Sequence, residues 1–210
     1  MKQLFVKPRA LVDSILVVML LAPLCTNASA ADISVKNYGH FKKMVHMNKT
    51  AGVVDLASAV TSEHSYAIGA IQQGRGEITI VDGDVWLDYG NDGIGNALNA
   101  IPTGEQAVLL VAAQVKSWQR STFSKPLLKH DLFKAILTHA SKAGVDVQKP
   151  FPFLLEGTFS QLRIHVINGT NPKFDGHGGK EKFYKQNIQQ RNNQSATVVG
   201  FYSAGTQGVY

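Results

Sequence analysis

The stretch "GRGEITIVDGDVWLDY", residues 74–89, decides the fold that the sequence predicts. Two runs rich in β-branched and aromatic residues, 77–81 and 85–89, flank the triplet Asp-Gly-Asp at 82–84. An Asp-Gly pair between two such runs favours a β-hairpin, because glycine adopts the positive φ that a tight turn requires. We therefore expect two antiparallel strands, the first opened by Glu77. That carboxylate is either a solvated acid at a sheet edge or a catalytic acid held on a rigid element.

The neighbouring segments extend this hairpin into a chain of strands and helices. Residues 66–72 predict a strand, and so does the long apolar run 106–118, for which a buried helix is the alternative. Residues 40–60 fit one or two short helices. The clearest helix spans 130–144, where apolar residues recur every four positions between an N-terminal Asp and a C-terminal Gly. Loops are expected at 73–76, at 91–105, around Pro150 and Pro152, and at 168–194.

Residues 153–169 alternate between apolar and polar positions, as a half-buried strand does. One face carries Leu162, Ile164 and Val166, and the other carries Gln161, Arg163 and His165. A guanidinium and an imidazole thus lie side by side on the polar face. Residues 196–210 return to strand character and reach the end of the sequence. These elements predict an α/β (α+β) fold with a mixed β-sheet.

The first thirty residues have the order of a secretory signal peptide, which is positive, then apolar, then small. Three bases precede the apolar run 15–25, and Ala28-Ser29-Ala30 fits a cleavage site. That run is shorter than the about 20 residues of a comfortable membrane span. We expect cleavage after Ala30 and export to the periplasm or the medium, with an uncleaved anchor or a buried helix as alternatives.

Cleavage would leave a single domain, 31–210, of 180 residues, long enough to bury a core. It would hold 18 Lys and Arg against 14 Asp and Glu, a net charge of +4. The single cysteine, Cys25, leaves with the signal, so neither a disulfide nor a cysteine metal ligand is expected. The charges form no stripe, so a nucleic-acid partner is not expected, nor is a membrane after cleavage. A small anionic substrate suits the mild positive charge.

Three strings in order resemble the acetolactate decarboxylase family: "AIGAIQQGRGEITIVDG" (67–83), "LLEGTFSQLRIHVI" (154–167) and "ATVVGFYSAGTQGVY" (196–210). The resemblance implies a two-part α/β structure on mixed β-sheet, with a homodimer as a possible assembly. It also implies a zinc-assisted lyase that converts 2-acetolactate to acetoin and CO2, so the expected partner is a small keto acid.

The resemblance assigns catalytic roles to three residues. The acid of the family, which follows a turn in a Gly-Glu context, falls on Glu77. The arginine of the family falls on His165 when it is counted without gaps from Gly157, and Arg163 lies two residues earlier on the same face. A cation there can hold the departing carboxylate, and the acid can protonate the enediolate. The change of arginine to histidine leaves the substrate open.

The zinc ligands of the family are three histidines that begin with a His-x-His pair just after the strand matching 196–210. The sequence ends at Tyr210, before such a pair, so we expect a partial domain, no metal residues and no zinc bound by this chain. The remaining histidines are scattered: His40, His46, His64, His130, His139, His165 and His177. Two alternatives stay open: a non-catalytic extracytoplasmic binding protein on the same fold, or a related lyase for another keto acid, which His165 favours.

Overall fold

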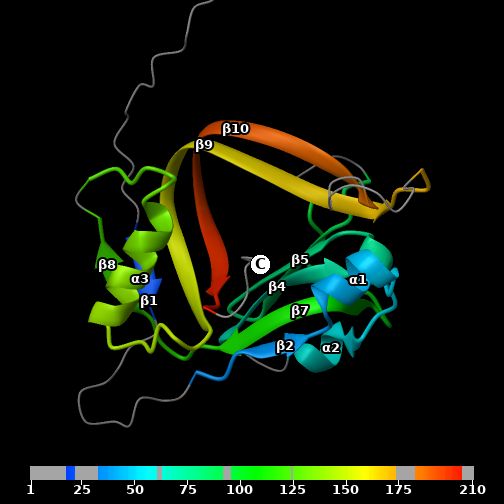
Figure 1. Ribbon diagram of the computed structural model, residues 1–210, viewed down its shortest axis with the longest axis horizontal. Coiled ribbons are helices and arrows are strands. Elements are labelled where there is room, and N and C mark those ends of the chain that lie inside the picture. The colour runs from blue at the N-terminus through cyan, green and yellow to red at the C-terminus, as the bar shows by residue number, and fades with distance from the viewer. Residues whose placement is uncertain are drawn as a thin grey trace, which may run out of the picture.

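The computed structural model describes residues 18–21, 33–60, 63–91, 96–123, 125–173 and 183–204 of the 210-residue chain. They form two antiparallel sheets with short helices at the periphery (Figure 1). The six-stranded sheet contains β2 (Lys36–Tyr38), β3 (Val54–Asp55), β4 (Ser65–Ile71), β5 (Glu77–Val81), β6 (Asp84–Asp88) and β7 (Gln106–Gln114). The four-stranded sheet contains β1 (Val18–Leu21), β8 (Gln119–Thr122), β9 (Phe151–Thr170) and β10 (Tyr184–Tyr202). The helices are α1 (Phe41–Met47), α2 (Leu56–Ala59), the 3₁₀ turn η1 (Gln72–Gly74) and α3 (Leu132–Lys142).

The hairpin predicted at 77–89 is confirmed. β5 and β6 pair antiparallel, and Asp82 and Gly83 between them have φ of 51° and 88°, the positive values of a type I′ turn. The six-stranded sheet has the order β2-β7-β4-β5-β6, and β3 also pairs with β7. Because β7 is hydrogen-bonded on both sides, the helix alternative for 106–118 is wrong. The predicted α/β (α+β) fold class is confirmed, but the strand pairs among the described residues are antiparallel and not mixed.

The helices also lie where the apolar spacing places them. Residues 40–60 contain the two short helices α1 and α2, and α3 occupies the centre of 130–144. The buried face of α3, formed by Ile136 and Ala140, packs on Phe123, Phe151 and Phe153, at the four-stranded sheet. This cluster gives that sheet a core of its own.

The loop expected at 168–194 is wrong over its second half. β10 begins at Tyr184 and pairs with β9 over nearly its whole length. The segment is polar because most of its side chains are exposed, while the backbone of β9 satisfies its hydrogen bonds. The loop expected at the prolines is also misplaced, since Pro152 is the second residue of β9, a strand-start position that proline tolerates. Of the strand expected at 196–210, the part up to Tyr202 is confirmed, and residues 205–210 lie outside the described residues.

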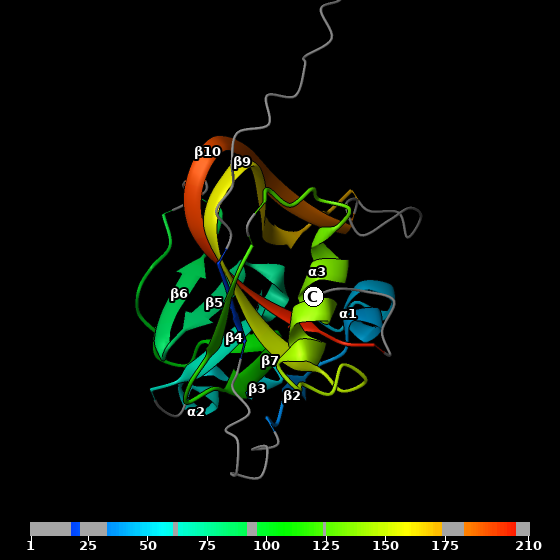
Figure 2. The same cartoon turned by 90° about the vertical axis from the view of Figure 1, so that its left-hand side faces the viewer.

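β9 and β10 form a long ribbon, here called the arch, that rises over the six-stranded sheet (Figure 1, Figure 2). Its first foot is Leu154 with Val199 and Phe201, which pack on Tyr66 of β4 and Ala113 of β7. Its second foot is Ile167 with Phe183 and Tyr184, which pack on residues of α1, β4 and β7. No residue at 156–165 or 185–198 is buried. The arch is therefore anchored at both ends and has no fully buried residue between them, although Phe159 and Val198 pack partly on the α3 cluster.

The edge of β9 that β10 leaves open pairs with β1, which in turn pairs with β8. β1 lies inside the predicted signal peptide, so cleavage after Ala30 would remove a strand from the four-stranded sheet. Cleavage itself stays a prediction. Among the helices of the described residues, none combines the length and apolar character needed to cross a bilayer.

Candidate active site

Glu77, the acid that opens β5, lies on the face of the six-stranded sheet that the arch crosses. Strand alternation sends Ile78 and Ile80 into the core on one face and Glu77 to the other. In the ladder Glu77 lies opposite Ala70 of β4 and Asp88 of β6. Ala70 packs against the second foot of the arch, so Glu77 beside it is brought to the same place.

The Glu77 carboxylate joins the two sheets. Its Oε1 accepts a hydrogen bond from the backbone N–H of Ile167 at 3.3 Å and lies 3.9 Å from Nδ1 of His165. The side chain of Glu77 is 29% exposed and that of His165 is 57% exposed. These are not the surroundings of a solvated residue at a sheet edge. They are those of an acid that is held at a seam and can still be reached by solvent.

Burial is the main reason that the Glu77 carboxyl binds its proton unusually strongly. Burial raises the pKa of Glu77, the hydrogen bond from the Ile167 N–H lowers it and the negative charge of Asp88 raises it; together they bring it from 4.5 to about 7. Near neutral pH, both protonation states of Glu77 are thus populated. An acid with this pKa can give a proton and regain it at neutral pH.

The structure brings His165 to Glu77 but places Arg163 farther along the arch. Arg163 is exposed and lies opposite Gln190 in the ladder. It shares the face of β9 with His165, and two residues of strand separate their Cα atoms by about 6.6 Å. Of the two side chains predicted to hold a carboxylate, His165 is thus the one beside the acid.

A buried carboxylate, Glu105, fixes the turn that leads into β5. Its Oε1 accepts from Arg75 Nη2 at 2.9 Å, and its Oε2 accepts from the Tyr89 hydroxyl at 2.6 Å. Burial, followed by this bond to Glu105, raises the pKa of Tyr89 to about 12. These bonds among Arg75, Glu105 and Tyr89 are here called the clamp. Arg75 lies two residues before Glu77, so the clamp fixes the position at which β5 begins and, with it, the position of Glu77. No local pattern in the sequence predicts the clamp, because Arg75, Tyr89 and Glu105 lie far apart in the chain.

The Gly90 backbone latches the second foot of the arch to the end of β6. Its carbonyl oxygen accepts hydrogen bonds from the side-chain amides of Asn168, at 2.9 Å, and Asn187. Its N–H donates to Asp88 Oδ1 at 2.9 Å. Gly90 has φ of 61°, and a Cβ there would lie 2.9 Å from Val166 Cγ1, so a side chain is both strained and obstructed.

Tyr184 is a buried polar residue near Glu77 that the sequence analysis missed. It is 6% exposed, and its hydroxyl has no hydrogen-bond partner among the described residues. Burial and then the charge of Glu77 raise the pKa of Tyr184 well above its usual range. The signal that was available is the aromatic pair Phe183-Tyr184 in an otherwise polar stretch.

The described residues do not assemble a three-ligand metal site of the kind that the resemblance implies. In the described part of the chain, no three His, Cys, Asp or Glu side chains meet at metal-binding geometry. Glu77 and His165 would supply two ligands, and a catalytic zinc needs about three. His177 lies outside the described residues.

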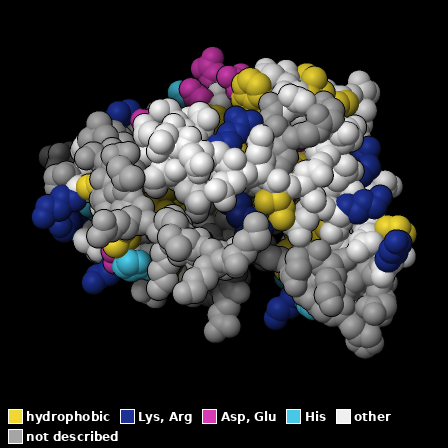
Figure 3. Space-filling view, turned by 90° about the horizontal axis from the view of Figure 1, so that it is seen from above, with side chains coloured by type: hydrophobic (Ala, Val, Ile, Leu, Met, Phe, Trp, Pro, Cys, Tyr) yellow, Lys and Arg dark blue, Asp and Glu magenta, His cyan; other side chains and the backbone are white. Residues whose placement is uncertain are grey.

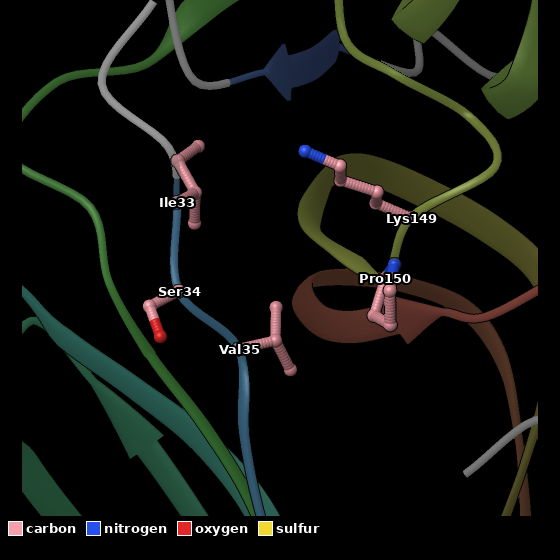
Figure 4. A pocket seen from close by; sticks show the side chains of 5 residues that line it. All are labelled: Ile33, Ser34, Val35, Lys149 and Pro150. Carbon is pink, nitrogen blue, oxygen red and sulfur yellow. The ribbon is translucent and has the colours of Figure 1, made fainter.

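On the described part of the surface seen from above, Lys and Arg side chains are separated from one another and acids are few (Figure 3). A shallow hollow elsewhere is lined by Ile33, Ser34 and Val35 on one side and by Lys149 and Pro150 on the other (Figure 4). It contains none of the predicted site residues, so it does not compete with the Glu77 site.

Comparison with solved structures reveals the fold of acetolactate decarboxylases. A protein of unknown function similar to alpha-acetolactate decarboxylase from Staphylococcus aureus is 14% identical, with a TM-score of 0.57 over 80% of this chain and 67% of that one. Alpha-acetolactate decarboxylase from Bacillus subtilis strain 168 is 16% identical, with a TM-score of 0.60 over 83% and 70%. The enzyme from Bacillus subtilis subspecies spizizenii is 14% identical, with a TM-score of 0.59 over 83% and 71%. No family model and no curated protein matches the sequence.

Proposed function

We propose, from this shared fold, that the chain is a carbon–carbon lyase of the acetolactate decarboxylase type that acts on a small keto acid, with Glu77 as its proton donor. One observation supports the proposal most. The Glu77 carboxyl is held between two sheets, is partly accessible, and has a pKa of about 7. Fold likeness alone does not define an activity, so the proposal depends on this acid.

The proposed reaction needs one proton delivered to carbon. In 2-acetolactate, the bond between the carboxylate and the hydroxyl-bearing carbon breaks and CO2 leaves. The electron pair of the broken bond stays on the substrate and moves toward the adjacent ketone, which gives an enediolate. Protonation of the carbon that lost CO2 then yields acetoin. The protonated Glu77 gives this proton and takes another from water, because its side chain is 29% exposed. We assign no described residue to the ketone oxygen.

His165 is proposed to hold the substrate carboxylate. Its Nδ1 lies 3.9 Å from the acid, so a small molecule bound at the imidazole also contacts Glu77. Arg163, on the same face of β9, would extend the reach of the site to a longer or doubly charged acid. The exchange of a bidentate guanidinium for an imidazole loosens the fixed orientation of a carboxylate, which fits a substrate other than 2-acetolactate.

A second function, non-catalytic binding of keto acids, is favoured by the lack of a three-ligand metal group among the described residues. The two functions differ in turnover. The chain would be mixed with 2-acetolactate, and acetoin would be measured by proton NMR, with and without added zinc. Calorimetry would measure binding of the alcohol obtained by reducing its ketone, which cannot lose CO2 by this route.

Glu77-dependent acetoin formation supports the lyase, and binding without acetoin supports the binding protein. Neither binding nor acetoin refutes both functions for 2-acetolactate. The control is Glu156→Gln, which removes a carboxylate of β9 that is paired with Arg120 at 3.2 Å.

A separate zinc titration tests the expectation that this chain does not bind zinc tightly. Stoichiometric micromolar binding would contradict it.

A further inference from the structure

Three contacts place the Tyr184 ring beside Glu77. Any Cβ on Gly74 would overlap the Tyr184 ring, so the turn before β5 lies directly against it. Tyr184 also shares its buried cluster with Ala70, and Ile167 packs on the same cluster. The edge of the ring meets Phe183, with centroids 4.5 Å apart and planes at 82°.

The same three neighbours hold Glu77. Ala70 is its partner across the ladder, Gly74 lies three residues before it, and the N–H of Ile167 is bonded to its carboxylate. The phenol and the carboxyl are thus fixed to one frame, although they lie 107 positions apart in the sequence. Shared packing of this kind positions two side chains far better than a contact between flexible loops does.

The Tyr184 hydroxyl also lacks a hydrogen-bond partner among the described residues. Buried tyrosine hydroxyls normally make a hydrogen bond, and a buried hydroxyl without one destabilises the fold. Its oxygen is shielded from solvent and has no partner in the described part of the chain. The fold thus places the buried Tyr184 hydroxyl, which has no hydrogen-bond partner among the described residues, close to Glu77, whose carboxyl changes its charge near neutral pH.

We propose that Tyr184 is a positioning residue for Glu77: its hydroxyl donates a hydrogen bond to the carboxylate once Glu77 has given up its proton. The bond forms when the side-chain torsions of Glu77 turn its carboxylate toward the phenol. It stabilises the anion and keeps the acid in place for reprotonation. Asp88 of β6 and His165 of β9 are the other titratable groups that face this carboxyl. The pairing is a property of the fold, and only its catalytic use rests on the proposed function.

The test is Tyr184→Phe, which removes one oxygen and keeps the ring. The Glu77 side-chain carboxyl would be titrated by 13C NMR in the full chain. Loss of a hydrogen bond to the charged form should raise the pKa of Glu77 by about one unit, a tenfold change in its protonation equilibrium. Below about pH 6, where Glu77 is protonated and the hydroxyl is unpaired, the melting temperature should stay level or rise in the variant, and above pH 8 it should fall, because the bond to the carboxylate is lost. Tyr202→Phe, at the other foot of the arch, should leave the titration unchanged.

An unchanged Glu77 titration in a folded Tyr184→Phe chain would overturn the proposal. If this variant does not fold, the wild type supplies the second measurement. The 13Cζ resonance of Tyr184 should shift with the Glu77 midpoint, and that shift should vanish in Glu77→Gln. A Tyr184 signal that ignores the midpoint would also overturn it. No substrate is used, so failure here is separate from failure of the proposed function.

Discussion

Glu77→Gln should make the protein less dependent on pH and more stable in mild alkali. The pKa of Glu77 is about 7 in the folded chain against an ordinary 4.5. Between these values the folded state binds more protons than the unfolded state, so stability falls as pH rises from about 4.5 to 7. A shift of about 2.5 units corresponds to about 3 kcal/mol. Glutamine keeps an oxygen for the Ile167 N–H and carries no charge, so it avoids this loss.

The assay is urea unfolding of wild type and Glu77→Gln at pH 4.5, 6, 7 and 8. Between pH 4.5 and pH 8, the free energy of unfolding of the variant should rise by up to about 3 kcal/mol relative to that of the wild type. Most of this change should occur below pH 7. Glu156→Gln is the matched control and should keep the wild-type pH dependence, because Glu77 is intact. Parallel stability curves for wild type and Glu77→Gln would refute the reasoning, since they would show that folding leaves the proton affinity of Glu77 unchanged.

Two further outcomes follow from the site and from the N-terminus. By calorimetry with the reduced analogue, His165→Ala should weaken binding about tenfold, roughly 1.4 kcal/mol, and Arg163→Ala should weaken it less. If Arg163→Ala weakened binding more than His165→Ala, the carboxylate would bind at Arg163 instead. Mass spectrometry of exported protein should find Ala31 at the N-terminus, and recovery of full-length chain alone would show that β1 is retained.

Elements with a local cause could be predicted from the sequence. The Asp82-Gly83 turn was predictable because only a few residue types accept two consecutive positive φ values. α3 was predictable because its apolar spacing matches the helix period. The alternation at 161–166 placed Arg163 and His165 on the exposed face, and the structure agrees.

Features that depend on distant partners could not be predicted. β10 has the composition of a loop, and it is a strand because β9 supplies its hydrogen bonds. That error hid Tyr184, which lies at the start of β10. The clamp on Glu105 and the latch at Gly90 join residues that no local pattern connects. The sequence thus predicted the acid and its histidine neighbour but not the groups that hold them.

The span of the Glu77–Ile167 hydrogen bond has a consequence for the order of assembly. It joins residues 90 positions apart, whereas β9 and β10 are consecutive strands joined by the segment 171–183. Contacts that close long loops form late, so the arch pairs with itself before it docks. Until it docks, Glu77 is an ordinary solvated glutamate that is ionised at neutral pH. We therefore expect the pKa of Glu77 to rise above that of a solvated glutamate only when the arch docks, and solvent exchange of the Ile167 amide to report each opening of this contact.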